Sequence, residues 1–140
     1  MTSLRHVWLV CGLAVLVLDT LGSLAARHWG FAYGTLSAVS FIIYFCAGVG
    51  GGRLSGVWAG GIAGGITALI DATLGWAISS SLGAMGRPGP ALTPLSITLV
   101  GLGVVFTGWS LGLLGGVIGR VVHRSLAADP SAAGAADKRL

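Results

Sequence analysis

The chain has 140 residues, of which 54% are hydrophobic and only 9% charged, and its mean hydropathy is +0.91. Soluble domains carry about a quarter charged residues, so this composition excludes an ordinary soluble domain or a disordered chain and is typical of an integral membrane protein. The formal net charge of +4 comes from basic residues scattered at the ends of apolar segments. Because they form no single patch, we expect no nucleic-acid partner and assign these charges to membrane orientation.

Four apolar stretches are long enough to cross a bilayer, because about 20 helical residues span a hydrocarbon core of about 30 Å. They cover residues 7–26, 31–52, 56–81 and 95–122. The connections are a polar turn at residues 27–30, a very short turn at residues 53–55, and a loop rich in Gly and Pro at residues 83–94. We therefore predict an all-α fold, an integral membrane bundle of four transmembrane helices within residues 1–124. Residues 125–140 are expected to form a disordered cytoplasmic tail.

The first span has a second interpretation as a cleavable signal peptide. Arg5, the apolar core and the sequence at residues 23–26 resemble the three regions of such a signal. We favour a retained helix, because its removal would break the pairing of segments described below. With four spans both termini lie on one side of the membrane, together with most of the basic residues: Arg5, Arg53, Arg120, Arg124, Lys138 and Arg139. The positive-inside rule predicts that this side is the cytoplasm.

Glycines at four-residue spacing form two stripes. The first consists of Gly48, Gly52, Gly56, Gly60 and Gly64, and the second of Gly108, Gly112 and Gly116. In water these residues would weaken a helix, but in a bilayer small residues four apart let two helices approach closely. We predict that they are helix-packing residues. The first stripe crosses the turn at Arg53, so its halves lie on antiparallel neighbours, and the fourth span is the expected partner.

Residues 48–65 also carry a resemblance. The pattern Ala-Gly-x-Gly-Gly-Gly-Arg, followed by Gly-x-x-x-Gly-Gly-x-x-Gly-Gly, resembles uncharacterised small bacterial four-span, glycine-rich integral membrane proteins. The resemblance covers the second and third spans. It implies a location in the bacterial cytoplasmic (inner) membrane and carries over no functional residue.

Two segments of the chain echo each other. Residues 18–22 (Leu-Asp-Thr-Leu-Gly) correspond to residues 70–75 (Ile-Asp-Ala-Thr-Leu-Gly) with one inserted residue, and the second and fourth spans both end in glycines followed by arginine. Two explanations stay open: a duplicated hairpin, or chance similarity in glycine-rich sequence. Duplicated hairpins would be parallel repeats. Asp19 and Asp71 would then lie at matching depth on equivalent helices, in the outer half of the membrane.

These two aspartates are the candidate site. A carboxylate within a span costs a few kcal/mol to insert and usually faces the bundle interior or a wet cavity. Two facing carboxylates would raise each other's proton affinity, because adjacent negative charges repel, so we expect one of them to be protonated at neutral pH. The functional hypothesis is a proton- or cation-handling pair. The alternative is that each aspartate reaches interfacial water, or hydrogen-bonds Thr20, Thr73 or the backbone.

No further constellation with chemistry is visible in the sequence. The cysteines and histidines have no metal-ligand spacing, and no nucleophile has a base partner, so we expect no enzyme activity, metal or cofactor. Two function classes remain. One is a structural or accessory subunit that assembles through the glycine stripes, as a homo-oligomer or within a larger membrane complex. The alternative is a minimal oligomeric transporter or channel that uses Asp19 and Asp71.

Overall fold

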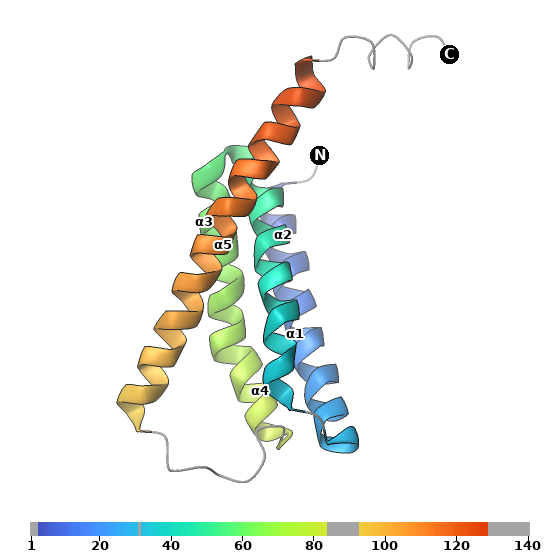
Figure 1. The fold of residues 1–140 in the computed structure, drawn as a ribbon, viewed down its shortest axis with the longest axis vertical. Helices are drawn as coiled ribbons and strands as arrows, with labels where there is room; N and C mark the ends of the chain where they lie inside the picture. The colour runs from blue at the N-terminus through green and yellow to red at the C-terminus, as the bar shows by residue number, and fades with distance from the viewer. Residues whose placement is uncertain (1–2, 31, 84–92, 129–140) are drawn as a thin grey trace, which may run out of the picture.

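A computed structural model describes residues 3–30, 32–83 and 93–128 of the chain. Within these residues four helical segments are long and apolar enough to cross a membrane: Leu4–Trp29, Gly34–Ser55, Val57–Ser81 and Pro94–Ser125. They pack side by side as a bundle (Figure 1), which confirms the predicted all-α, four-helix membrane fold. The duplication of two hairpins stays a prediction.

The first segment is one continuous helix, α1 (Leu4–Trp29). It ends later than residue 26, where we predicted the span to stop, because Arg27 and His28 form its last turn. Cationic side chains are favourable there, next to the negative end of the helix dipole. Gly30 then ends the helix in a left-handed conformation (φ 72°), and its N–H donates to the carbonyl of Ala26 at 2.8 Å.

The second and third segments form a tight hairpin. A short 3-10 turn, η1 (Tyr33–Leu36), leads into α2 (Ser37–Ser55). The third segment is divided into α3 (Val57–Ile70), a π-helical turn η2 (Asp71–Gly75), and α4 (Trp76–Ser81). Residues 53–55, predicted to be the connection, are instead the last turn of α2, and Gly56 alone reverses the chain with φ 96°. Glycine suits this position because other residues rarely adopt such a φ.

The fourth segment is the long helix α5 (Pro94–Ala128). It begins with proline, whose missing N–H costs nothing at the first helical position. The helix continues past residue 122, where we predicted the span to end, so residues 125–128 are helical rather than the start of a tail. Residues 129–140, the rest of the expected tail, lie outside the described residues.

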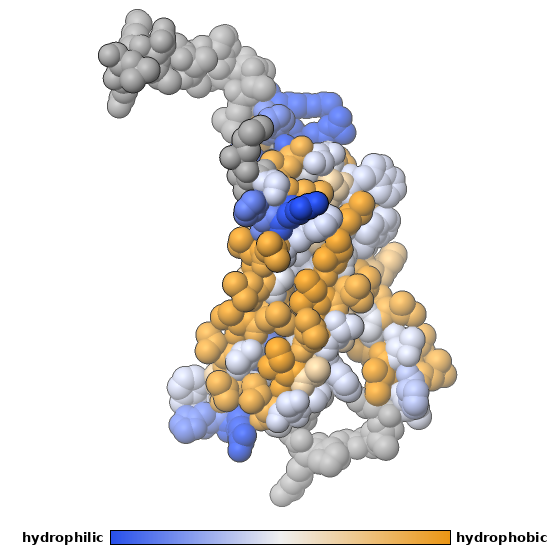
Figure 2. Space-filling view, turned by 180° about the vertical axis from the view of Figure 1, so that it is seen from behind, coloured by the Kyte–Doolittle hydropathy of each residue, from blue (hydrophilic) through white to orange (hydrophobic). Residues whose placement is uncertain are grey.

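The bundle inverts the side-chain distribution of a soluble protein. The buried hydrophobic residues are mostly small: Val15, Ala26, Tyr44, Ala47, Ala59, Ala63 and Ala68. Large aliphatic side chains such as Leu9, Leu13 and Leu114 are at least 60% exposed. On the face shown in Figure 2, apolar residues cover the middle of the molecule, and hydrophilic residues lie towards both ends. Small residues inside and large apolar residues outside are expected where lipid is the solvent.

Glycines form the contact between α2, α3 and α5. A Cβ atom added to Gly60 would lie 2.6 Å from Gly116 Cα, 2.7 Å from the carbonyl oxygen of Gly48 and 2.8 Å from that of Gly112. Contacts this short mean that three backbones meet with no room for a side chain. The predicted packing residues other than Gly56 therefore lie together, and both halves of the first stripe face the same helix, α5.

Candidate functional site

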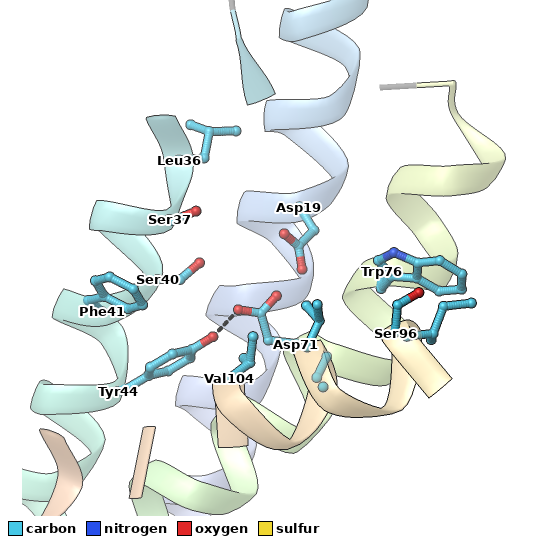
Figure 3. Close-up of a pocket in the computed structure, with 14 residues that line it drawn as sticks. Asp19, Leu36, Ser37, Ser40, Phe41, Tyr44, Asp71, Trp76, Ser96 and Val104 are labelled. Atoms are coloured by element: carbon cyan, nitrogen blue, oxygen red, sulfur yellow. Dashed lines mark hydrogen bonds between the residues drawn. The ribbon is translucent and has the colours of Figure 1, made fainter. Parts of the chain in front are cut away.

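Three polar side chains from three segments meet inside the bundle. Asp19 on α1 is buried, with 2% of its surface exposed, and Tyr44 on α2 is buried with 1% exposed. Asp71, in the π-helical turn η2, is partly buried. The Tyr44 hydroxyl donates a hydrogen bond to Oδ2 of Asp71, and Figure 3 shows the Asp19 carboxyl group turned toward the same space.

Gly75 shows how close the two carboxyl groups lie. A Cβ atom added to this glycine would collide with the Asp19 carboxyl group, whose Cγ would be 2.9 Å away, and would lie 2.9 Å from Oδ1 of Asp71. Both carboxyl groups therefore border the small space that a side chain at residue 75 would fill. The structure thus brings together the two aspartates that the sequence proposed as a pair.

The π-helical turn matches the one inserted residue in the sequence echo. Within η2 the backbone N–H of Trp76 donates to the carbonyl of Asp71, five residues earlier, which accommodates one more residue than an α-helical turn. The equivalent stretch of α1 is regular α-helix. The extra residue of residues 70–75 is therefore accommodated within this turn, and Asp71 lies at its start. Such π turns occur frequently at functional sites.

The alternative interpretation expected Thr20 and Thr73 to hydrogen-bond the aspartates, but both hydroxyl groups donate to backbone carbonyls instead. The Thr20 hydroxyl donates to the carbonyl of Leu16 at 2.7 Å, and the Thr73 hydroxyl donates to that of Leu69 at 2.6 Å. Both bonds lie within their own helices. One turn further along α1, the Ser23 hydroxyl donates to the Ser79 hydroxyl at 3.0 Å. This buried hydrogen bond joins α1 to α4 next to the aspartates.

The aspartates border a cavity of about 320 Å³. Its walls come from all four spans, and the residues that line it are Asp19, Leu36, Ser37, Ser40, Phe41, Tyr44, Asp71, Ala72, Trp76, Ser96, Ile97, Val100, Gly101 and Val104. Most of the wall is apolar; the carboxyl groups and the Tyr44 hydroxyl lie on the side formed by α1, α2 and η2, and α5 contributes one hydroxyl, from Ser96 (Figure 3). Ligand pockets commonly combine such an apolar wall with a few convergent polar groups.

The cavity lies beside a part of α5 that packs loosely. The N-terminal half of α5 stands apart from the other helices (Figures 1 and 2). A Cβ atom added to Gly101 or Gly103 would meet no atom within 4 Å, whereas one added to Gly108 would meet the carbonyl oxygen of Gly64 at 2.9 Å. The glycine contact therefore begins at residue 108 of α5. Val104 still packs against the buried cluster that contains Tyr44, and the turns before it pack more loosely.

The remaining predicted packing glycines differ in environment. Gly48, Gly52 and Gly64 lie against Gly112, Gly116 and Gly108. Gly56 is the exception, because it forms the turn itself and the nearest atom to an added Cβ would be Nη1 of Arg120 at 3.8 Å. Its spacing matches the stripe, but its role is to reverse the chain.

Sequence reasoning did not single out Tyr44, Ser40 or Gly75 as site residues. A signal for the first two was present, because residues 37, 40, 41 and 44 follow the i, i+3, i+4, i+7 spacing of one helix face. That face carries two serines and a tyrosine within an otherwise apolar span. Gly75 offered no such signal, since it is one of 25 glycines in the chain.

Comparison of the chain with protein-family models, curated proteins and solved structures finds no match. Within the described residues no three His, Cys, Asp or Glu side chains lie together as they would in a metal-binding cluster.

Proposed function

We propose that this multi-pass membrane protein is a small carrier that binds a monovalent cation at Asp19 and Asp71 in exchange for a proton. The observation that carries the proposal is that two carboxyl groups from different helices border one cavity inside an apolar bundle. In the resting state the pair holds one proton, and in the loaded state it holds the cation.

Electrostatics supports a shared site. Two adjacent carboxylates surrounded by apolar atoms repel each other, so keeping both ionised needs a positive charge close by. A proton or a bound cation supplies that charge. Tyr44 donates to Asp71 and is the one other titratable group among the described residues that line the cavity. Exchange of one proton for one monovalent cation leaves the net charge of the site unchanged, which avoids burying an uncompensated charge.

The structural or accessory subunit stays a prediction that assigns the glycine stripes to assembly. Gly48, Gly52, Gly60 and Gly64 are buried against α5 of the same chain, so their close-packing surface is already occupied. Self-association stays a prediction, to be measured by native mass spectrometry in mild detergent.

The proposal includes an orientation. With the termini and Arg53 in the cytoplasm of a bacterial cell, as the positive-inside rule predicts, the aspartates lie in the outer half of the bilayer. A cation from outside would then reach the pair over a shorter path than one from the cytoplasm. Protease accessibility of a tag at the C-terminus in spheroplasts measures this orientation.

Reconstituted vesicles test the carrier function. Liposomes that contain the protein and an internal pH indicator receive sodium, potassium, tetramethylammonium or benzyltrimethylammonium chloride outside. We expect at least one cation to drive proton efflux, and we expect the paired substitution Asp19→Asn and Asp71→Asn to abolish it. Thr73→Val, which removes a lipid-facing hydroxyl beside Asp71, is the matched control and should retain the flux. Equal flux with and without the carboxyl groups, or no response to any cation, would contradict the proposal.

A further inference from the structure

We infer that the cation is organic: a monovalent ammonium-type ion with an aromatic or branched apolar body, bound in the cavity between the aspartates and the N-terminal half of α5. This inference rests on the proposed function and names its substrate class. It follows from the lining, the size and the surroundings of the cavity.

The lining pairs carboxyl groups with aromatic rings. Phe41 and Tyr44 lie on one helix face with ring centroids 6.1 Å apart, and Trp76 borders the cavity from α4. Aromatic faces attract ammonium groups through the ring quadrupole, more strongly where water is excluded. Leu36, Ile97, Val100 and Val104 complete the wall with aliphatic surface. The ammonium group of such a cation would therefore lie against the aspartates, while its apolar body would contact the aromatic rings and aliphatic side chains.

The dimensions favour an organic ion over a divalent metal ion. A volume of about 320 Å³ reaches the range of pockets that bind organic molecules, which begins near 300 Å³. A bare divalent cation instead needs a compact shell of six or more oxygen ligands. In the described part of the chain the carboxyl groups lie on one side of the cavity, and the wall that α5 contributes is mainly aliphatic, with Ser96 as its one hydroxyl.

The loosely packed first turns of α5 give an organic cation a path from the bilayer into the cavity. Much of the wall contributed by α5 comes from its first turns, which lie away from the other helices (Figure 1). Leu95, Leu99 and Leu102 on this part are at least 60% exposed and face the bilayer. An amphiphilic cation concentrates in the membrane interface and can enter beside α5 without crossing the packed glycine contact.

The exchange step involves no covalent change in the ion. The O–H bond of the protonated carboxyl group breaks, its proton passes to water, and the ammonium group takes its place as the counter-charge between Asp19 and Asp71. One proton leaves for each cation bound.

Calorimetry in detergent measures both the ligand and the proton. Benzyltrimethylammonium is the probe, neopentylbenzene is its neutral isostere, and sodium and potassium are the inorganic competitors. Titration in two buffers of different ionisation enthalpy counts the protons released. We expect the organic cation to bind at least tenfold more tightly than sodium or potassium, with one proton released, and the neutral isostere to give no signal that depends on the aspartates.

Two glycines on α5 provide a matched pair of variants. Gly101 borders the cavity and Gly103 does not, yet an added Cβ atom at either position would meet no atom within 4 Å. Gly101→Leu should fill the cavity and weaken binding of the organic cation at least tenfold, and Gly103→Leu should leave it unchanged. Trp76→Leu, with the exposed Trp58→Leu as its control, tests the aromatic wall independently of packing on α5.

The outcomes separate this inference from the proposed function. If sodium or potassium releases a proton in an aspartate-dependent manner and benzyltrimethylammonium does not, the carrier proposal stands and the organic substrate is wrong. If the neutral isostere binds as well as the cation, or if Gly101→Leu and Trp76→Leu bind like their controls, the inference is also overturned. If no cation binds or releases a proton, both proposals fail.

Discussion

The glycine contact between α2, α3 and α5 can be tested with two alanine substitutions in one helix. A Cβ atom at residue 112 would lie 2.5 Å from the carbonyl oxygen of Gly60 and 2.9 Å from Gly64 Cα. The backbones would have to separate, and overpacking of this kind costs about 1–3 kcal/mol. A Cβ atom at Gly103, in the same helix, would meet nothing within 4 Å.

Comparing the stabilities of Gly112→Ala and Gly103→Ala isolates the cost of packing, because both substitutions gain the same helix propensity of about 0.5–1 kcal/mol. That contribution cancels between the variants, so Gly112→Ala should be about 1–3 kcal/mol less stable than Gly103→Ala. The assay is equilibrium unfolding in mixed micelles of increasing dodecyl sulfate content, followed by tryptophan fluorescence. Equal unfolding midpoints, or a more stable Gly112→Ala protein, would refute the close approach of the three backbones.

The remaining predictions concern the site and the turn. Tyr44→Phe removes the donor to Asp71, a bond to a charged group worth about 1.5–3 kcal/mol, so calorimetry should show cation affinity about tenfold weaker or more. Gly75→Ala should push the carboxyl groups apart and weaken cation binding in the same assay, with little change in helix content by circular dichroism; unchanged affinity would contradict the placement of the pair. Because cation and proton compete, the apparent Kd should rise about tenfold for each unit fall in pH where one proton is exchanged, and a flat profile would exclude exchange. Gly56→Ala forces a Cβ into positive φ and should lower the free energy of unfolding by about 1–2 kcal/mol, whereas a neutral effect would argue against the single-residue turn.

Composition and hydrophobic run length were enough to predict the four spans, because a bilayer demands long apolar helices and little else. The ends of the spans were harder to predict. Arg27 and His28 belong to α1 because basic residues are tolerated in a last helical turn, and hydropathy alone does not register that. Gly56 fits the four-residue spacing, yet its positive φ could not be read from a stripe in which every member is glycine.

The sequence was enough to identify Asp19 and Asp71, because charged residues are rare inside a span. It was not enough to predict the residues around them. Tyr44 reaches Asp71 across 27 residues of sequence, and no local pattern encodes that contact. The π turn was visible as one extra residue in an echo, without a way to tell an insertion within a helix from a chance mismatch. The cavity depends on where α5 leaves the bundle, and that follows from the three-dimensional packing of glycines.

The central claim is that Asp19 and Asp71 together exchange one proton for a cation. Infrared difference spectroscopy of the reconstituted protein measures this directly, because a protonated carboxyl group has a C=O stretch distinct from that of a carboxylate. We predict that benzyltrimethylammonium removes a carboxylic-acid band and adds a carboxylate band in the wild-type protein, and that neither change appears after Asp19→Asn and Asp71→Asn. If the difference bands persist in the doubly substituted protein, or if cation addition leaves the carboxyl bands of the wild-type protein unchanged, the claim is wrong.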